Sequence, residues 1–557
     1  MKTIITKIDG FKYCLYPETK TAELIESHKE YSGNIIIPST ILHKRLFSKT
    51  YYNVTSIGIY AFARCSALET VTISDGIKTI GSNAFIACSS LTSISIPNSV
   101  TEIGEFAFNH CTSLLTITIP CNISKLGRCL FKDCSSLNSI TISNGVTTLC
   151  KAPFEDCKSI KSIIIPCSIA SIEKKCFNDS KSLSEIILSA LSVESFCRTK
   201  INNLLYEADY CYNIKRKILI DGAEKENIII PEGITTIETR AFFNCISLRS
   251  VTIPKTVTSI ESHAFDNCKN LKEIAISDGV THIAEFAFWY CESLSSVNIP
   301  CSVVGIGKQA FSQCLSLQSV IIPDSVTNLD AAVFNHCTCL KSVNLPKNLK
   351  YLKSVSIDNE LHIGLFTDCS SLQSIVIPET VRVIEDNTFA GCSALTKITI
   401  PYEVRRIGKN VFKGCSALTS IIWNAKACSP TQWTEENYKY HHWEFERYQF
   451  YYGPFANIAK QIISFTFGKD VKSIPKYLCW DMQQLTELVV PNDDIQFDKS
   501  WAGGHTWKSV TIPHCIVSRQ PIIEIAYRAK ETYIVANSME EYCLQPMITG
   551  SEWYERD

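Results

Sequence analysis

Cysteine is the residue type in this chain with the widest chemistry, because thiols bind metals, form disulfides and act as nucleophiles. The sequence contains 27 cysteines among 557 residues. A subset stands three residues after a phenylalanine each time, and Ser180 takes the same place once. These thirteen cysteines are Cys65, Cys88, Cys111, Cys134, Cys157, Cys245, Cys268, Cys291, Cys314, Cys337, Cys369, Cys392 and Cys415. Their spacing decides which roles are open to them.

No Cys-x-x-Cys pair occurs in the sequence, which argues against common zinc and redox motifs. Successive members of the column belong to successive repeats, where they would lie about 4.8 Å apart. Disulfide geometry needs Cβ atoms about 3.8 Å apart, so one strand spacing is too far. We predict that these thiols are buried and structural, with a metal site or a disulfide as the minor alternative. The odd total excludes complete internal pairing, and free thiols are typical of a reducing compartment.

The phenylalanines that precede these cysteines mark a repeat of 23 residues. Ile or Leu stands five residues before each of them, Leu or Ile six residues after, and Val or Ile nine residues after. The LxxIxIP segment alternates at period two, which predicts a short strand ended by proline. The IGxxAF segment predicts a second short extended piece that turns into a one-turn helix. A unit this small must stack on its neighbours to bury an apolar face. The column consists of Phe62, Phe85, Phe108, Phe131, Phe154, Phe177, Phe242, Phe265, Phe288, Phe311, Phe334, Phe366, Phe389 and Phe412.

The stretch IGSNAFIACSSLTSISIPNSVTEIGEFAFNHCTSLLTITIP resembles the BspA-like leucine-rich repeat family, whose consensus runs IGxxAFxxCxxLxxIxIP. The resemblance implies a repeat solenoid of the β-rich α/β class. This would be a right-handed leucine-rich repeat superhelix with parallel strands and short helical turns. It also implies a protein without catalytic activity. Members are often surface or secreted proteins that bind host proteins or other cells.

Three interruptions of the 23-residue period divide the sequence. We expect an N-terminal β lead-in at 1–53, a first repeat block at 54–190 and a β insertion that restarts the stack at 191–233. A second repeat block at 234–423 precedes an aromatic-rich insertion at 424–460. Degenerate repeats follow at 461–513, where Cys479 takes the phenylalanine position, and a C-terminal cap occupies 514–557.

The predicted strands expose two positions per repeat, eight and ten residues after the phenylalanine. Ser and Thr dominate there and charges are few. Candidate partner-binding residues on this face are Ser93, Ser95, Thr118, Thr141, Thr252, Asn298, Asn344 and Thr399. The functional interpretation is a broad docking face for a protein or glycan. The alternative is that Ser and Thr simply suit an exposed parallel sheet.

The aromatic insertion adds Trp433, Tyr438, Tyr440 and Trp443 as candidate contacts for a partner or a sugar. Its rings could instead pack on the flank of the solenoid. His441 and His442 are adjacent, so they lack the spacing of a helical zinc site. We find no nucleophile motif, phosphate loop or spaced carboxylate pair, so the sequence predicts no enzyme and no cofactor.

Charge and hydropathy exclude further classes of function. The net charge is −1 without a sustained Lys/Arg run, so neither nucleic-acid binding nor a polybasic membrane patch is expected. No apolar run approaches a membrane span and no secretion signal is visible, so the location stays open. We therefore expect a monomeric, non-enzymatic protein that binds a protein or cell-surface ligand. An intracellular scaffold and a glycan-binding module are the alternatives.

Overall fold

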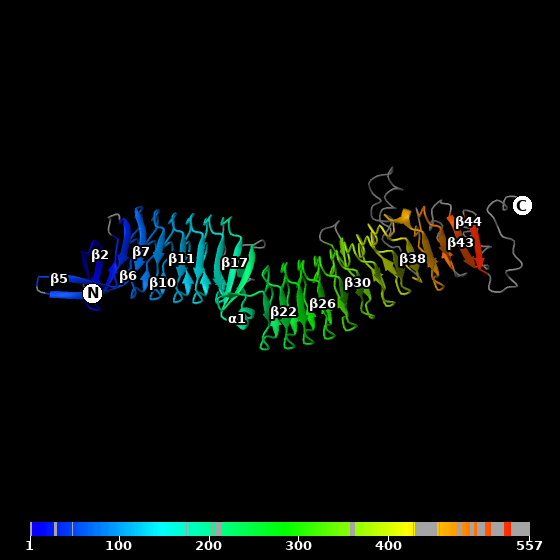
Figure 1. Ribbon diagram of the computed structural model, residues 1–557, viewed down its shortest axis with the longest axis horizontal. Coiled ribbons are helices and arrows are strands. Elements are labelled where there is room, and N and C mark those ends of the chain that lie inside the picture. The colour runs from blue at the N-terminus through cyan, green and yellow to red at the C-terminus, as the bar shows by residue number, and fades with distance from the viewer. Residues whose placement is uncertain are drawn as a thin grey trace. The chain divides into compact units, whose positions relative to one another are not determined.

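The computed structural model describes residues 3–26, 31–46, 48–173, 175–177, 179–201, 204–205, 214–356, 362–426, 428, 454–455, 457–475, 478–479, 482–490, 495–497, 507–513 and 529–535. The chain folds as two compact units (Figure 1). Unit 1 comprises Met1–Ile234 and Glu238–Leu248, and unit 2 comprises Thr235–Ile237 and Arg249–Asp557. Each unit is a stack of coils with one coil per repeat, so the predicted solenoid is confirmed.

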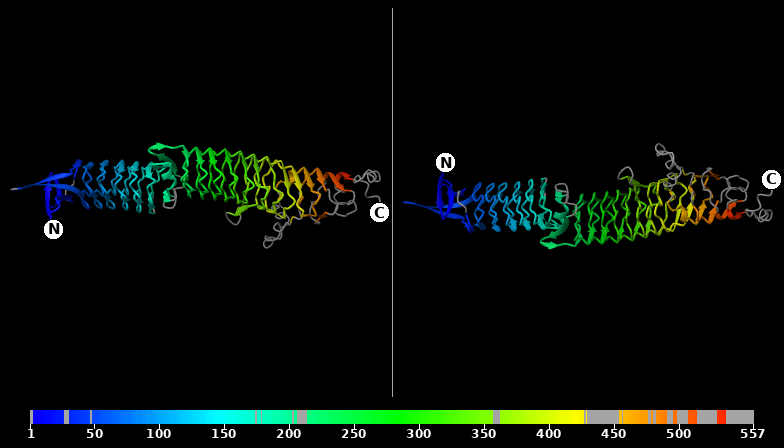
Figure 2. Two further views of the ribbon diagram at one scale, coloured as in Figure 1. Left: turned by 90° about the horizontal axis from the view of Figure 1, so that it is seen from below. Right: turned by 90° about the horizontal axis from the view of Figure 1, so that it is seen from above.

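Most of the described coils contribute two strands to the stack. The front strand carries the LxxIxI motif, and the back strand carries an Ile or Leu, which lies five residues before the phenylalanine except in the coil of Phe366, where it is Leu352. Strands of successive coils pair in parallel at equivalent repeat positions, as in Ser139↔Ser162 and Thr148↔Ser171. Figure 2 shows the strands of each unit lying side by side in chain order. The register therefore turns each repeat position into a column along its unit.

Unit 1 starts with an antiparallel meander and a hairpin that lead into the coils. The meander consists of β1 (Ile4–Ile8), β2 (Phe11–Tyr16) and β3 (Thr21–Leu24), and the hairpin of β5 (Thr40–Arg45) and β6 (Ser48–Ile57). Between them, β4 (Gly33–Ile37) pairs in parallel with the first of the front strands. The front strands are β7 (Leu68–Ile73), β9 (Ser93–Ser95), β11 (Thr116–Ile119), β13 (Ser139–Ile142), β15 (Ser162–Pro166) and β17 (Glu185–Ala190). The back strands are β8 (Thr79–Ile80), β10 (Glu102–Ile103), β12 (Lys125–Leu126), β14 (Thr148–Leu149) and β16 (Ser171–Ile172).

The insertion that ends unit 1 contains the helix α1 (Val193–Cys197) and the strands β18 (Lys215–Ile220), β19 (Ala223–Glu224) and β20 (Asn227–Ile229). Ser192 caps α1, because its hydroxyl accepts from the Ser195 amide while Ser195 bonds back to the Ser192 amide. β18 extends the front sheet beside β17 and turns back as β19. The insertion therefore contains an antiparallel pair, β18 with β19.

Unit 2 repeats the same arrangement. Its front strands are β22 (Ser250–Ile253), β24 (Glu273–Ile276), β26 (Ser296–Asn298), β28 (Ser319–Ile321), β30 (Ser342–Asn344), β34 (Ser374–Ile375), β36 (Lys397–Ile400), β38 (Ser420–Trp423), β39 (Ser464–Phe467), β41 (Glu487–Val489), β43 (Trp507–Pro513) and β44 (Ala529–Val535). Its back strands are β21 (Thr236–Ile237), β23 (Ser259–Ile260), β25 (His282–Ile283), β27 (Gly305–Ile306), β29 (Asn328–Leu329), β31 (Tyr351–Leu352), β35 (Val383–Ile384), β37 (Arg406–Ile407), β40 (Ser473–Ile474) and β42 (Gln496–Phe497). The insertion before Phe366 forms the hairpin β32 (Ser354–Ser356) and β33 (His362–Gly364).

The AF segment differs from its prediction, because it forms a corner of consecutive turns rather than a one-turn helix. In the coil of Phe85 the amides of Ala84, Ile86 and Cys88 each donate to the carbonyl three residues earlier. Asn83 and Ala87 adopt φ of 57° and 59°, in the left-handed region. Two left-handed residues four positions apart prevent a continuous helix. Among the described residues, helix occurs at α1, at the 3-10 turn η1 (Ala459–Gln461) and around Ile201, Leu204 and Leu205.

A third ladder of backbone hydrogen bonds joins these corners. The amides of Asn83, Phe85 and Ala87 donate to carbonyls of the next coil at 2.8–3.0 Å. Each corner is thus bonded to its neighbour much as the strands are. This ladder compensates for the left-handed backbone.

The core confirms the phenylalanine column. Successive rings stack within each unit at centroid distances of 5.0–6.0 Å and interplanar angles of 2–10°. All but Phe177 are fully buried. Cys479 and Met482, which replace Phe and Cys in the degenerate repeat, are buried as well. Because each ring contacts the coil before and the coil after, one side chain stabilises two interfaces.

Candidate binding surfaces

The cysteine column has a structural role that the geometry makes specific. In most coils the thiol donates to the carbonyl of the phenylalanine one coil earlier, as Cys88 Sγ does to Phe62 O at 3.1 Å. The same bond joins Cys157 to Phe131 and Cys415 to Phe389, each at 3.1 Å. Ser180 makes it with its hydroxyl, 2.9 Å from Phe154 O. Serine fits this column because it can donate the same hydrogen bond.

The predicted partner-binding residues of the front strands all lie on one face of their sheets. Six are exposed, and Thr141 and Thr399 are half-buried. Within unit 1, Thr118 and Thr141 are direct neighbours on β11 and β13. Within unit 2, Asn298 and Asn344 stand on either side of Ile321. Thr252 lies beside Ala275, and Thr399 beside Ile422.

This face of unit 2 also carries aliphatic side chains that the candidate set left out. Ile321 is 71% exposed and Val376 is 81% exposed, both ten residues after their phenylalanine. The column reads Asn298, Ile321, Asn344, Val376 and Thr399 in chain order. Two large aliphatic groups are thus presented between amide and hydroxyl groups.

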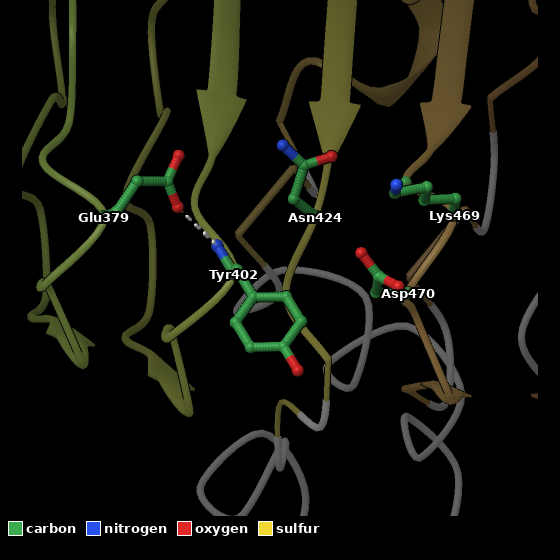
Figure 3. Close-up of a pocket in the computed structure, with 6 residues that line it drawn as sticks. Glu379, Tyr402, Asn424, Lys469 and Asp470 are labelled. Carbon is green, nitrogen blue, oxygen red and sulfur yellow. Dashed lines mark hydrogen bonds between the residues drawn. The ribbon is translucent and has the colours of Figure 1, made fainter.

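A pocket of about 480 Å³ lies where the turns follow four front strands of unit 2 (Figure 3). Its lining residues are Glu379, Tyr402, Asn424, Gly468, Lys469 and Asp470. The register Ile400↔Trp423↔Phe467 aligns the residues that follow, Pro401, Asn424 and Gly468. Asn424 and Gly468 thus occupy the position directly after β38 and β39 that Pro401 occupies after β36. A Cβ at Gly468 would meet the Asn424 side chain, so glycine keeps the two turns close.

The repeat region matches the model of the BspA type leucine rich repeat region at residues 46–158, 113–218, 212–341, 263–364 and 359–486. These matches together span well over half of the chain. The chain belongs to the BspA-type leucine-rich repeat family.

Solved structures of leucine-rich repeat proteins are similar to this BspA-type chain at low identity. A leucine-rich cell surface protein of Faecalibacterium prausnitzii is 25% identical, with 76% of this chain and 96% of that chain covered and a TM-score of 0.29. A leucine-rich repeat protein of Bacteroides ovatus is 20% identical, with 95% and 99% covered and a TM-score of 0.32. The pneumococcal vaccine antigen PcpA is 17% identical, with 72% and 93% covered and a TM-score of 0.30. No curated protein matches the chain.

The thiols of this BspA-type protein are poor nucleophiles where the column is buried. Burial raises the pKa of Cys111, Cys157 and Cys415 to about 12. The same cause raises the pKa of Cys314 well above its usual range. Because the thiolate is the reactive form, buried and protonated thiols react slowly with electrophiles and oxidants.

The structure describes only part of the aromatic insertion. The candidates Trp433, Tyr438, Tyr440 and Trp443 lie outside the described residues, as do His441 and His442. Beyond them Phe455 rejoins the phenylalanine column, with its ring 5.2 Å from that of Phe412. The 3-10 turn η1 follows, and β39 then pairs with β38. The repeat therefore resumes before the predicted end of the insertion at residue 460.

The pocket beside this insertion combines an aromatic face with polar groups. The Tyr402 amide donates to Glu379 Oε2 at 3.2 Å, which holds the carboxylate at the rim. The Lys426 ammonium lies 5.5 Å from the centroid of the Tyr402 ring. Hydrogen bonding to the Tyr402 side chain raises the pKa of Lys426, which stays cationic. In Figure 3 the Tyr402 ring extends from the turn between the Glu379 and Asp470 turns.

Proposed function

We propose that this BspA-type protein is a non-enzymatic, adhesion-type protein that engages a protein or cell-surface partner through its front face. The observation that supports this most is the pair Ile321 and Val376, which are 71% and 81% exposed on the front face of unit 2 beside amide and hydroxyl side chains. Exposed aliphatic anchors among hydrogen-bonding groups are the composition of a contact patch. The patch takes the candidate residues Asn298, Asn344 and Thr399 as its polar surroundings.

The family membership supports the same role, because a solenoid offers its extended surface rather than a cleft as the binding site. The sheet is rigid, so its side chains are ordered before binding and lose little further freedom. Ser and Thr hydroxyls adapt as donor or acceptor, which suits many weak contacts. In this proposal, such weak hydrogen bonds to the partner come from Ser93, Ser95, Thr118, Thr141 and Thr252.

The test is retention on immobilised extracellular-matrix and host-surface proteins. Val376→Asp places a charge in the patch and should lower retention at least about tenfold, because a buried unpaired carboxylate is costly. Val304→Asp is the matched control, since Val304 is exposed beside the back strand β27. Equal loss for both variants, or no loss for Val376→Asp, contradicts the role of the front face.

The pocket supports a second candidate, a glycan-binding site next to the aromatic insertion. Sugars place apolar ring faces on aromatic side chains and exchange hydrogen bonds with carboxylates and amides. Tyr402 offers the ring, and Asn424 and Asp470 offer the polar groups. The aromatic insertion, which follows Asn424 in the sequence, contains Trp433, Tyr438, Tyr440 and Trp443.

A glycan array separates the two candidates. Tyr402→Ala should remove binding to a sugar that the pocket holds, while Tyr351→Ala, an exposed tyrosine of the back strand β31, should leave it intact. Binding that survives Tyr402→Ala excludes the pocket. Retention on matrix proteins should not change in either tyrosine variant if the front face carries that activity.

A further inference from the structure

The β5–β6 hairpin of unit 1 brings the cations of one short basic segment, residues 43–49, onto a two-stranded ribbon. Cross-strand pairing places Lys44 opposite Lys49 and Arg45 opposite Ser48, with His43 opposite Thr50. The segment 39–53 contains no aspartate or glutamate. Like charges directly opposite each other destabilise a ribbon, so the pair is costly to the fold itself. Within the described part of the chain no carboxylate forms an ion pair with Lys44, Arg45 or Lys49.

The same hairpin carries apolar groups at and behind its tip. Leu46 is 90% exposed, the highest value among the exposed large hydrophobic residues of the described chain. Tyr51 is 67% exposed and lies opposite Leu42. Because side chains alternate along a strand, Leu42, Lys44, Lys49 and Tyr51 share one face of the ribbon. This face therefore runs from an aliphatic and aromatic pair through two ammonium groups toward an apolar tip.

The outer half of the hairpin makes its strand pairing only within the hairpin. β6 pairs with β3 and β8 only from Asn53 onward, whereas Ser48–Tyr52 pair with β5 alone. Figures 1 and 2 show the β5–β6 ribbon extending away from the stacked strands of unit 1. An isolated two-stranded ribbon gains little stability in water. The exposure of Leu46 is thus not explained by packing within unit 1.

We propose that the β5–β6 hairpin is a docking site for an anionic lipid surface, with the lysines at the headgroups and Leu46 in the acyl boundary. Lysine and arginine are attracted to anionic headgroups, and their long stems let the charge remain in the headgroup layer. Tyrosine is suited to the same interface because its ring is apolar and its hydroxyl is polar. A soluble polyanion would pair with the cations equally well. It offers nothing to Leu46, which is why a lipid surface is favoured.

This attachment is independent of the proposed front-face function, because it involves the lead-in hairpin and no front strand. It requires no membrane-spanning segment, and in the part of the chain that the structure describes no helix has the length and apolarity to cross a bilayer. The hairpin combines electrostatic attraction by its cations with insertion of one apolar side chain, Leu46. Reversible binding of a peripheral protein to a membrane needs such a combination.

The test uses the full chain and vesicles of phosphatidylcholine, with and without phosphatidylglycerol, in a flotation assay. Binding should require phosphatidylglycerol and weaken as salt rises. Lys44→Glu with Lys49→Glu should reduce it more than about tenfold, since each lysine near an anionic surface contributes about fivefold and reversal adds repulsion. Lys341→Glu with Lys397→Glu is the charge-matched control and should bind normally, since these exposed lysines lie just before β30 and at the start of β36.

Leu46→Ser distinguishes a lipid surface from a soluble polyanion. It should weaken vesicle binding several-fold while leaving retention on a heparin column unchanged. The proposal is overturned if phosphatidylglycerol vesicles do not bind, or if the charge-reversed variant still binds them. It is also overturned if Leu46→Ser binds vesicles as tightly as the parent, because the site would then recognise charge alone. All variants should have the same melting curve as the parent, because the substituted positions are exposed to solvent. Matching curves then exclude a folding defect as the cause of weaker binding.

Discussion

The buried corner of each coil and the exposed front strand follow the same 23-residue period but obey opposite rules. At the corner, phenylalanine and cysteine recur almost without exception, since each ring and each thiol contacts the preceding coil. On the front strand, position ten after the phenylalanine varies among Ser, Thr, Ala, Asn, Ile and Val. At the corner, the residue type must fit the packing of two neighbouring coils. On the solvent-facing positions of the front strand, only a binding partner restricts the residue type.

This difference separates stability from recognition within one repeat. Changes at the corner should alter the free energy of unfolding and leave the binding chemistry of the face intact. Changes on the front strand should do the reverse. Three measurements test the division, beginning with the one that affects the whole array.

Alkaline pH should destabilise the entire column at once. The ordinary thiol pKa is near 9, and burial raises the pKa of Cys111 and Cys157 to about 12. Between pH 9 and 12 the unfolded chain releases these protons while the folded chain keeps them, so the free energy of unfolding falls as pH rises. Each thiol contributes about 1 kcal/mol per pH unit in that window. Melting temperatures measured from pH 8 to 11 should fall steeply.

A variant with Cys111, Cys134 and Cys157 changed to serine supplies the control for this titration. Its melting temperature should depend less on pH, because hydroxyl groups do not ionise in this range. A profile identical to that of the parent would assign the alkaline loss to other groups, such as tyrosine and lysine.

Phe288→Ala should be the most damaging single change in the middle of unit 2. The ring stacks on Phe265 at 5.2 Å and on Phe311 at 5.1 Å, so its removal opens a cavity at two coil interfaces. We expect a loss of about 3–5 kcal/mol in the local coils. Hydrogen exchange of the neighbouring front strands measures it. Phe286→Ala, at a half-buried ring two residues away, should cost clearly less, and equal costs would contradict the core role of the column.

Cys314→Ala and Cys314→Ser should separate hydrogen bonding from packing in the thiol column. Cys314 Sγ donates to Phe288 O at 3.3 Å. Alanine loses this bond and should cost about 1–2 kcal/mol, whereas serine keeps it, as Ser180 does. Denaturant unfolding measures both. If serine is as costly as alanine, packing alone explains the column. Ser319→Ala on the front strand should leave stability unchanged within about 0.5 kcal/mol.

The corner could be predicted from the sequence because a period of 23 residues identifies each buried position many times over. The left-handed residues could not be predicted. They include Arg64, Phe286 and Tyr290, which are not residue types that favour positive φ. Their conformation is set by hydrogen bonds to the adjacent coil, which no single repeat contains.

The candidate surfaces could be predicted less completely than the corner, because they depend on side-chain exposure and on contacts across insertions and between paired strands. The 23-residue period already places Ile321 between Asn298 and Asn344, but the sequence does not reveal how far each of these side chains is exposed. The pocket needs Gly468 beside Asn424 across a long insertion, so spacing alone cannot place it. The hairpin contains no long run of cations, and only antiparallel pairing brings Lys49 to Lys44. The signal was the basic segment HKRLFSK, which has no acid near it.

The three hydrogen-bonded ladders of each coil have a mechanical consequence. A force that pulls a terminal coil from its unit must break the front, back and corner ladders together, because all three bind the same neighbouring coil. Extension under load should therefore proceed in steps of one coil, each releasing about 23 residues of chain. A protein built in this way could stay anchored under shear by losing coils from one end while the rest remained folded.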